Sequence, residues 1–113
     1  MKKILFAALL IMSITSCTTT KLYSWYDYEN RAYEYSKTPT DELRDKLLKQ
    51  YKKITEKQDG TRGVVPPGLY AEYGYLLYTT GKEEEGLNFL KEEIKLYPES
   101  EIYISRIIKQ LEK

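Results

Sequence analysis

The fold is decided by residues 66–98, which read PPGLYAEYGYLLYTTGKEEEGLNFLKEEIKLYP. The paired prolines predict a helix over residues 69–80, because a proline in the first turn of a helix loses no hydrogen bond. Gly81 supplies a left-handed stop. A second helix is predicted over residues 82–97, with three glutamates in its first turn, where negative charge is favoured. The segment therefore predicts a hairpin of two antiparallel helices.

Glycine and proline residues are spaced at regular intervals along the two helices of this hairpin. Twelve residues separate Gly74 from Gly86, and twelve more lead to Pro98. Small residues at the first two positions would let the helix backbones approach closely where they cross. The spacing resembles the tetratricopeptide repeat, a helical hairpin with small, aromatic and proline residues at fixed positions. The positions that match are Tyr70, Tyr73, Gly74, Leu77, Gly81, Gly86, Leu90 and Pro98.

Two residues depart from the repeat pattern. Glu93 stands where the repeat usually has alanine. Gly86 replaces alanine inside a helix, at a cost of about 1 kcal/mol. An ordinary helical hairpin with accidental glycines is the alternative interpretation.

The residues before the hairpin also show helical spacing. Helices are predicted over residues 24–36 and 41–57, and the stretch 58–65, with its two glycines, is predicted to be a loop. For the second of these helices, either Thr38 is the N-cap or Asp41 is. This upstream pair resembles a degenerate copy of the repeat, with the partial signature Trp25, Tyr28 and Ala32.

A last helix is predicted over residues 100–113. Four apolar residues would lie along one face, with polar residues elsewhere, and they are Ile104, Ile107, Ile108 and Leu111. Ser100 is its candidate N-cap. This helix would cap the stack, as the terminal element of a repeat array must. The prediction is therefore an all-α, tetratricopeptide-like domain over residues 23–113, with about two helix pairs and a capping helix.

The N-terminal residues predict where in the cell the protein is located. Residues 1–16 combine a basic start, nine unbroken apolar residues and small residues before Cys17, as in a cleaved secretory signal. The apolar run is too short for a membrane span, which needs about 20 residues. The tetrapeptide ITSC at 14–17 resembles the lipobox of bacterial lipoproteins, in which the cysteine is diacylated with chains such as palmitate. A buried or free thiol is the alternative role for Cys17.

Residues 17–22 would then form a lipidated tether. By resemblance to lipoproteins of bacteria with two membranes, Thr18 after the cysteine, in place of aspartate, favours transfer to the outer membrane. The expected location of the domain is therefore the periplasmic face of the outer membrane.

The composition excludes most enzyme chemistry. The 113 residues include no histidine and one cysteine, which rules out histidine-dependent catalytic pairs, imidazole metal sites, an internal disulfide and a thiolate zinc cluster. The 18 lysines and arginines balance 17 acidic residues, so no basic surface for nucleic acid is expected. We expect a non-enzymatic protein without cofactor, metal or small-molecule substrate. A cell-wall glycan-acting enzyme is the remote alternative.

A second resemblance covers nearly the whole chain. It rests on the lipobox, on LYSWY at 22–26 with YEY at 33–35, on VPPGL at 65–69 before a helix containing Gly74, and on YPES at 97–100. These motifs look like a family of small bacterial lipoproteins of unknown function, domain of unknown function 4810. The resemblance implies a tetratricopeptide-like body and company with other lipoproteins, including ones related to the curli secretion channel. It supplies no catalytic residues.

In tetratricopeptide arrays the first helix of each pair lines a concave groove. By that placement the candidate partner-binding residues are Tyr26, Asn30, Tyr33, Ala71, Tyr75 and Tyr78. A tyrosine-lined groove suits a peptide or helix from another protein, since each ring offers apolar area and a hydroxyl. The expected function is an assembly module for an envelope or secretion-related lipoprotein complex. Two alternatives remain open: an accessory subunit that uses its helix ends, and tyrosines that only fill the core.

Overall fold

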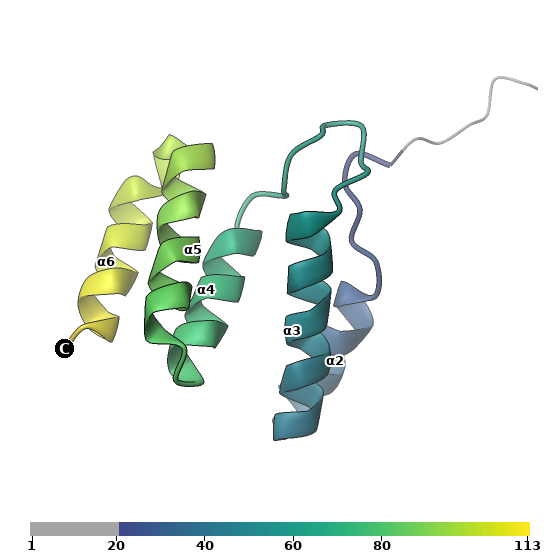
Figure 1. Cartoon of the computed structure of the whole chain (residues 1–113), viewed down its shortest axis with the longest axis horizontal. Helices are drawn as coiled ribbons and strands as arrows, with labels where there is room; N and C mark the ends of the chain where they lie inside the picture. The colour runs from purple at the N-terminus through teal and green to yellow at the C-terminus, as the bar shows by residue number, and fades with distance from the viewer. Residues whose placement is uncertain (1–20) are drawn as a thin grey trace, which may run out of the picture.

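The computed structural model describes residues 21–113, so the predicted signal peptide at 1–16 and Cys17 lie outside the described residues. The described residues form five α-helices and no strand, which confirms the all-α prediction. The helices run alternately up and down, side by side (Figure 1). They are α2 (Tyr28–Lys37), α3 (Asp41–Glu56), α4 (Leu69–Thr79), α5 (Glu83–Leu96) and α6 (Glu101–Leu111), with a 3-10 turn at Pro98–Ser100.

Helices α4 and α5 form the hairpin that residues 66–98 predict. Gly74 and Gly86 face each other where the helices cross, because a Cβ added to either glycine would lie 2.5 Å from the carbonyl oxygen of the other. Gly81 has a φ of 101°, the left-handed conformation expected at the turn. The two backbones therefore touch directly, and no larger residue fits at either crossing position.

The start of α4 differs in detail from the prediction. The helix begins at Leu69 as expected, but Pro66 and Pro67 precede it and are not in its first turn. The N-cap is Gly68, with a φ of 89°. A glycine has no side chain to bind the free amides of the first turn, so their acceptor must come from water or from a residue elsewhere in the chain.

The predicted starts of α2 and α3 need correction. Helix α2 begins at Tyr28 and not at residue 24, because Tyr26 has a left-handed φ of 50° that no helix accommodates. Helix α3 is capped by Thr40, whose Oγ1 accepts a hydrogen bond from the amide of Leu43 at 3.2 Å. Neither Thr38 nor Asp41 is the N-cap. Thr38 is instead the C-cap of α2, and its amide donates to the carbonyl of Glu34.

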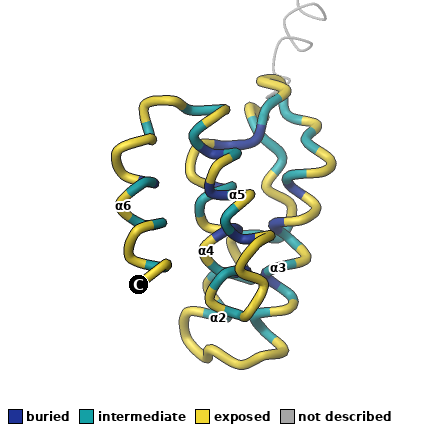
Figure 2. The backbone as a smooth tube through the Cα atoms, turned by 60° about the vertical axis from the view of Figure 1, so that its left-hand side comes forward, coloured by how far each residue is buried: buried dark blue, intermediate teal, exposed yellow. Residues whose placement is uncertain are grey.

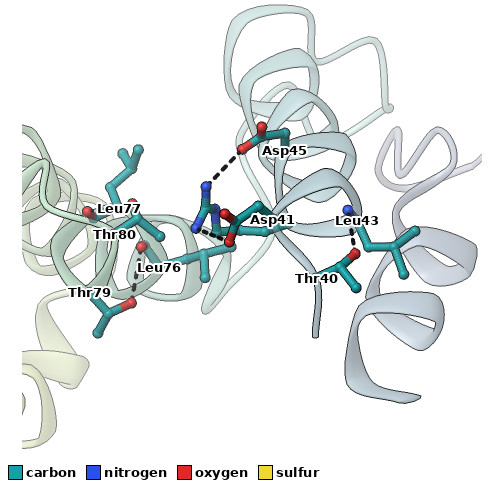
Figure 3. A network of polar contacts seen from close by, with 9 residues as sticks. Thr40, Asp41, Leu43, Asp45, Leu76, Leu77, Thr79 and Thr80 are labelled. Carbon is teal, nitrogen blue, oxygen red and sulfur yellow. Dashed lines mark hydrogen bonds and ion pairs between the residues drawn. The ribbon is translucent and has the colours of Figure 1, made fainter. Parts of the chain in front are cut away.

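Polar contacts fix the first turn of α3 (Figure 3). The guanidinium of Arg44 pairs with the carboxylates of Asp41 at 3.1 Å and Asp45 at 3.3 Å. The figure also shows Leu76 and Thr79 at the end of α4 across from this turn, where the hydroxyl of Thr79 donates to the carbonyl of Leu76 at 3.1 Å. Threonine hydroxyls thus satisfy backbone groups at both of these helix ends.

The core lies where α3, α4 and α5 meet, drawn dark blue in Figure 2. Its fully buried side chains include Ile54, Leu69, Leu77 and Leu90. Helix α2 has no buried residue. It is joined to the core by aromatic rings instead, and the ring centroids of Tyr28 and Tyr51 lie 5.7 Å apart.

Helix α6 packs with one face on α5. Ile104 is 1% exposed, and Ile107, Ile108 and Leu111 are half-buried, which confirms the predicted apolar face. The rest of the helix is not uniformly polar as predicted, because Ile102 is 72% exposed and Tyr103 is 68% exposed.

Ser100 occupies the expected N-cap position of α6 but does not cap it. Its hydroxyl donates to the carbonyl of Tyr97 at 2.7 Å.

Candidate partner-binding groove

A hollow of about 490 Å³ lies between α4 and α6. Its lining comes from one face of α4, its N-cap and the facing side of α6, and consists of Gly68, Ala71, Glu72, Tyr75, Tyr103, Ile107 and Gln110. We call this hollow the α4/α6 groove. Two of the residues predicted from the sequence, Ala71 and Tyr75, lie in it.

Two exposed tyrosines dominate the α4/α6 groove. Tyr75 on α4 is 50% exposed, and Tyr103 on α6 is 68% exposed. Aromatic rings of this kind supply apolar contact area at low conformational cost, with a hydroxyl at the tip for hydrogen bonding. Together with the half-buried Ile107, which also lines the groove, the two tyrosines make a surface able to receive an apolar side chain from another molecule.

Tyr78, also predicted to line the groove, lies outside its lining. Its ring is half-buried, and its hydroxyl donates to the carbonyl of Leu111 at 3.0 Å. That carbonyl belongs to the last turn of α6, where backbone acceptors lack helical partners. Tyr78 therefore ties the end of α6 to α4. Burial, followed by the nearby carboxylates of Glu83 and Glu112, raises the pKa of its phenol.

The three predicted residues at the N-terminal end of the domain are not in the α4/α6 groove either. The hydroxyl of Tyr26 donates to the carbonyl of Lys57. The side-chain amide of Asn30 donates to the carboxylate of Asp27 at 2.7 Å. Tyr33 is 61% exposed, with the ammonium of Lys37 4.9 Å from its ring centroid. The structure thus separates the six candidates into two on the groove and four elsewhere.

Glu72, which lines the α4/α6 groove, links α4 to the first helix pair. Its Oε2 accepts hydrogen bonds from the hydroxyls of Tyr28 at 2.6 Å and Tyr51 at 3.3 Å. Burial first, and then the carboxylate of Glu72, raise the pKa of both phenols well above their usual range. Both tyrosines therefore stay protonated, and continue to donate, at a more alkaline pH than an exposed tyrosine would.

Glu93 is buried beside the first turn of α4. Only 2% of it is exposed, and its Oε1 accepts a hydrogen bond from the amide of Ala71 at 3.3 Å. Burial raises the pKa of this carboxyl, while bonds from the amides of Ala71 and Gly68 act in the opposite direction. The side chain that departs from the repeat pattern thus supplies the acceptor that Gly68 lacks.

Sequence reasoning missed five lining residues of the groove: Gly68 and Glu72 on the α4 side, and Tyr103, Ile107 and Gln110 on α6. Ile107 was expected only as part of the apolar face of the last helix. The available signal was the repeat geometry itself, because the helix that follows a pair occupies the place of the next first helix and so borders the same concave side. Tyr103 beside the apolar stripe of that helix would then have been a candidate.

A second hollow, of about 470 Å³, opens between α3, α4 and α5. Lys49, Lys52 and Lys82 border it together with Glu56 and Glu85, so its charges are mixed. Over residues 21–113, no group of three acidic or cysteine side chains is arranged to hold a metal ion. No helix within that same range is both long and apolar enough to cross a membrane.

Comparison with known proteins identifies a family. Residues 22–107 match the family described as Domain of unknown function (DUF4810), and the chain belongs to that family. No curated protein and no solved structure matches the chain.

Proposed function

We propose that this member of a family of unknown function is a protein-protein interaction module that helps assemble an envelope or secretion-related lipoprotein complex. The observation that carries the proposal is the α4/α6 groove, where Tyr75 and Tyr103 leave large aromatic surfaces exposed. Exposed aromatic residues around an apolar hollow are typical of sites that bind another protein. The absence of histidine removes the most common catalytic groups, so binding is the simpler role.

The helical body is proposed to be tetratricopeptide-like. The mutual contact of Gly74 and Gly86 and the left-handed Gly81 support this, because all three fall at the intervals of the repeat. In such an array the α4/α6 groove corresponds to the concave face. An apolar peptide segment or an amphipathic helix is the form of partner that this face fits.

The domain is further proposed to be anchored in the outer membrane, on the periplasmic face, by diacylation of Cys17. The ITSC motif directly after an apolar run of nine residues supports the anchor. Because each buried methylene contributes about 0.8 kcal/mol, two or three acyl chains would hold the protein on the membrane essentially permanently. Lipoproteins related to the curli secretion channel are candidate neighbours, as the family resemblance implies.

A second candidate function is an accessory subunit that stabilises a complex without using the groove. The exposed Ile102, which does not line the groove, favours this candidate because a large apolar side chain in solvent suits a contact with another protein. The two candidates require different surfaces of α6 and can therefore be separated by mutation.

The experiment is affinity recovery of the anchored protein with its neighbours from solubilised envelopes. The double variant Tyr75→Ala with Tyr103→Ala should lose the partners that the wild type recovers. Tyr78 is left intact, because its bond to Leu111 makes it part of the packing of α6. Tyr33→Ala is the control, since the exposed fraction of Tyr33, 61%, lies between those of Tyr75 and Tyr103, but Tyr33 is outside the groove.

Two other results would redirect the proposal. Recovery that survives the double variant but is lost in Ile102→Glu would favour the accessory role. Equal incorporation of a fatty-acid analogue into the wild type and Cys17→Ala would exclude the lipid anchor.

A further inference from the structure

Exposed apolar residues are concentrated at the N-terminal end of the described chain. Of the seven large hydrophobic residues that are exposed over residues 21–113, three lie within five positions of one another: Leu22 at 58%, Trp25 at 41% and Tyr26 at 40%. Together with Lys21 and Tyr23 they line a hollow of about 390 Å³. We call these five residues the N-terminal patch.

The N-terminal patch is held firmly on the domain. The carbonyls of Lys21 and Leu22 accept hydrogen bonds from the amides of Thr61 and Arg62 at 3.0 and 3.2 Å. A Cβ on Gly60 would lie 2.2 Å from the carbonyl oxygen of Leu22, so the loop and the N-terminal segment are in direct backbone contact. The loop over residues 58–65, at the top of Figure 1, thus forms a base for the patch.

Side chains reinforce this base. The Oε1 of Gln58 accepts from the amide of Ser24 at 2.5 Å, and the Nε2 of Gln58 donates to the carbonyl of Ser24 at 3.2 Å. The hydroxyl of Ser24 accepts from the amide of Asp59 at 3.1 Å. Because its backbone is bonded in this way, the chain segment that carries the exposed rings has a fixed position relative to the rest of the domain.

Cations lie beside the rings of the patch. The ammonium of Lys53 is 4.3 Å from the ring centroid of Tyr26, and the guanidinium of Arg62 is 6.0 Å from that of Tyr23. Within the described part of the chain, neither cation has an acidic partner within ion-pair distance. Asp59 is the exposed acidic residue of the same loop. Tryptophan, tyrosine and basic side chains together are the composition enriched where proteins meet the headgroup region of a bilayer.

The proposed anchor brings this patch to a membrane. Four residue steps separate Cys17 from Lys21. Fully extended, they span at most about 14 Å. A diacylated Cys17 would sit in the bilayer, so the N-terminal patch could not move far from the lipid surface.

We propose that the N-terminal patch rests on the phospholipid surface, with Trp25 and Leu22 at the level of the headgroups. This inference rests on the proposed lipid anchor and deepens it, because it gives the domain an orientation. Helix α3 ends and α4 begins at the end of the molecule where the patch lies (Figure 1). With the patch on the bilayer, the helices extend away from the membrane and the α4/α6 groove remains open to a partner.

The test uses Trp25 as an internal probe, because it is the only tryptophan in the chain. The full chain, processed and lipidated in bacteria, is reconstituted into vesicles of phosphatidylethanolamine and phosphatidylglycerol, with or without lipids brominated near the headgroup. Contact should shift the Trp25 emission to the blue and quench it roughly twofold in the brominated vesicles, as expected for an indole at the interface. Flotation of the vesicles and the mass of the protein report the anchor independently.

Matched variants test whether the quenching depends on the N-terminal patch or would change on substitution of any exposed apolar residue. Leu22→Glu with Lys53→Glu should reverse most of the quenching while the protein still floats, and circular dichroism checks that it remains folded. Ile102→Glu with Lys109→Glu makes the same change in charge at exposed positions on α6 and should leave the quenching unchanged.

Three results would overturn the proposal. Vesicles that carry the lipidated protein without quenching of Trp25 would refute the membrane contact while leaving the anchor intact. Protein that lacks the lipid mass and fails to float would refute the anchor, and the orientation with it. Shielding of Trp25 from a water-soluble quencher in native envelopes, but not in vesicles of pure lipid, would assign the patch to a protein partner.

Discussion

The two helix pairs pack by different physical means. In the α4/α5 pair, Gly74 and Gly86 bring the backbones into contact, and the buried Leu77 and Leu90 also belong to this pair. The α2/α3 pair differs, because α2 buries no residue and the pair is joined to α4 by the stacked rings of Tyr51 and Tyr73 and by two tyrosine hydroxyls on Glu72. The first kind of packing depends on the absence of a side chain, and the second depends on particular large ones.

This contrast predicts which substitutions will destabilise the domain most. Close-packed backbones have no way to yield to an added atom. Packed aromatic rings such as the buried Tyr51 and the half-buried Tyr28 can shift and be replaced at somewhat lower cost, although their hydroxyl bonds are specific.

The variant Gly74→Val should destabilise the domain by about 4 kcal/mol or more, at or beyond the usual limit for overpacking. Its Cβ would meet the carbonyl oxygen of Gly86 at 2.5 Å and the amide nitrogen of Leu90 at 2.9 Å, and both atoms belong to a helix backbone. Urea unfolding followed by circular dichroism measures the change. Gly81→Ala is the control, because it has no neighbour within 4 Å and costs only the strain of its positive φ. Equal losses in the two variants would refute the backbone contact.

The variant Tyr51→Ala should cost about 3 kcal/mol, as for other buried aromatic residues. Its ring lies 5.7 Å from that of Tyr28 and 5.5 Å from that of Tyr73, so it joins α2 to the core. Hydrogen exchange should accelerate in α2 and α3 more than in α4 and α5. Tyr51→Phe keeps the ring and should cost only about 1 kcal/mol for the lost bond to Glu72. Uniform acceleration along the chain would show that the two pairs are not distinct in stability.

Alkaline pH should weaken the first pair before the second. The pKa values of Tyr28 and Tyr51 are raised above the ordinary 10.0 by burial and by Glu72. Their contribution to stability is therefore complete below pH 10.0 and is lost as the pH rises toward the folded pKa values. Loss of helix signal should accompany the ultraviolet absorbance of the phenolates. Tyr28→Phe should make the loss less steep, and an unchanged profile in that variant would contradict the role of this tyrosine.

Glu93→Gln should have the smallest effect. Since burial raises the pKa of Glu93 above its ordinary 4.5, its contribution is largest near and below pH 4.5 and decreases as the pH rises through the folded pKa. The glutamine keeps an acceptor for the amide of Ala71 and has no charge. We therefore expect equal or slightly greater stability at neutral pH, with a flatter dependence on acidification. A large loss on this substitution would mean that the negative charge itself stabilises the start of α4.

The fold could be predicted well where local rules act. Proline, glycine and the apolar intervals placed α4, α5 and α6 within two residues of their observed ends. Prediction failed at the start of α2, because the amides of Ser24 and Asp27 are bound by the distant side chains of Gln58 and Gln50. No local pattern signals a partner more than 20 residues away along the chain.

The candidate site could be predicted only in part for a similar reason. Helical spacing groups Ala71, Tyr75 and Tyr78 on one side of α4, but it cannot say how α6 will cover that side. The end of α6 covers Tyr78, whose hydroxyl donates to the carbonyl of Leu111. It leaves Tyr75 exposed. The tetratricopeptide assignment, the lipid anchor and the partner remain predictions.

The sequence by itself determined an all-helical body over the described residues and a glycine-crossed hairpin, because turn residues and periodicity act over a few positions, and its composition determined the lack of histidine chemistry. Only the tertiary structure decided which tyrosines remain exposed, that Glu93 serves the first turn of α4, and that the N-terminal segment lies on the loop over residues 58–65. These features depend on side chains and backbone groups far apart in the chain, and they meet only when the helices pack.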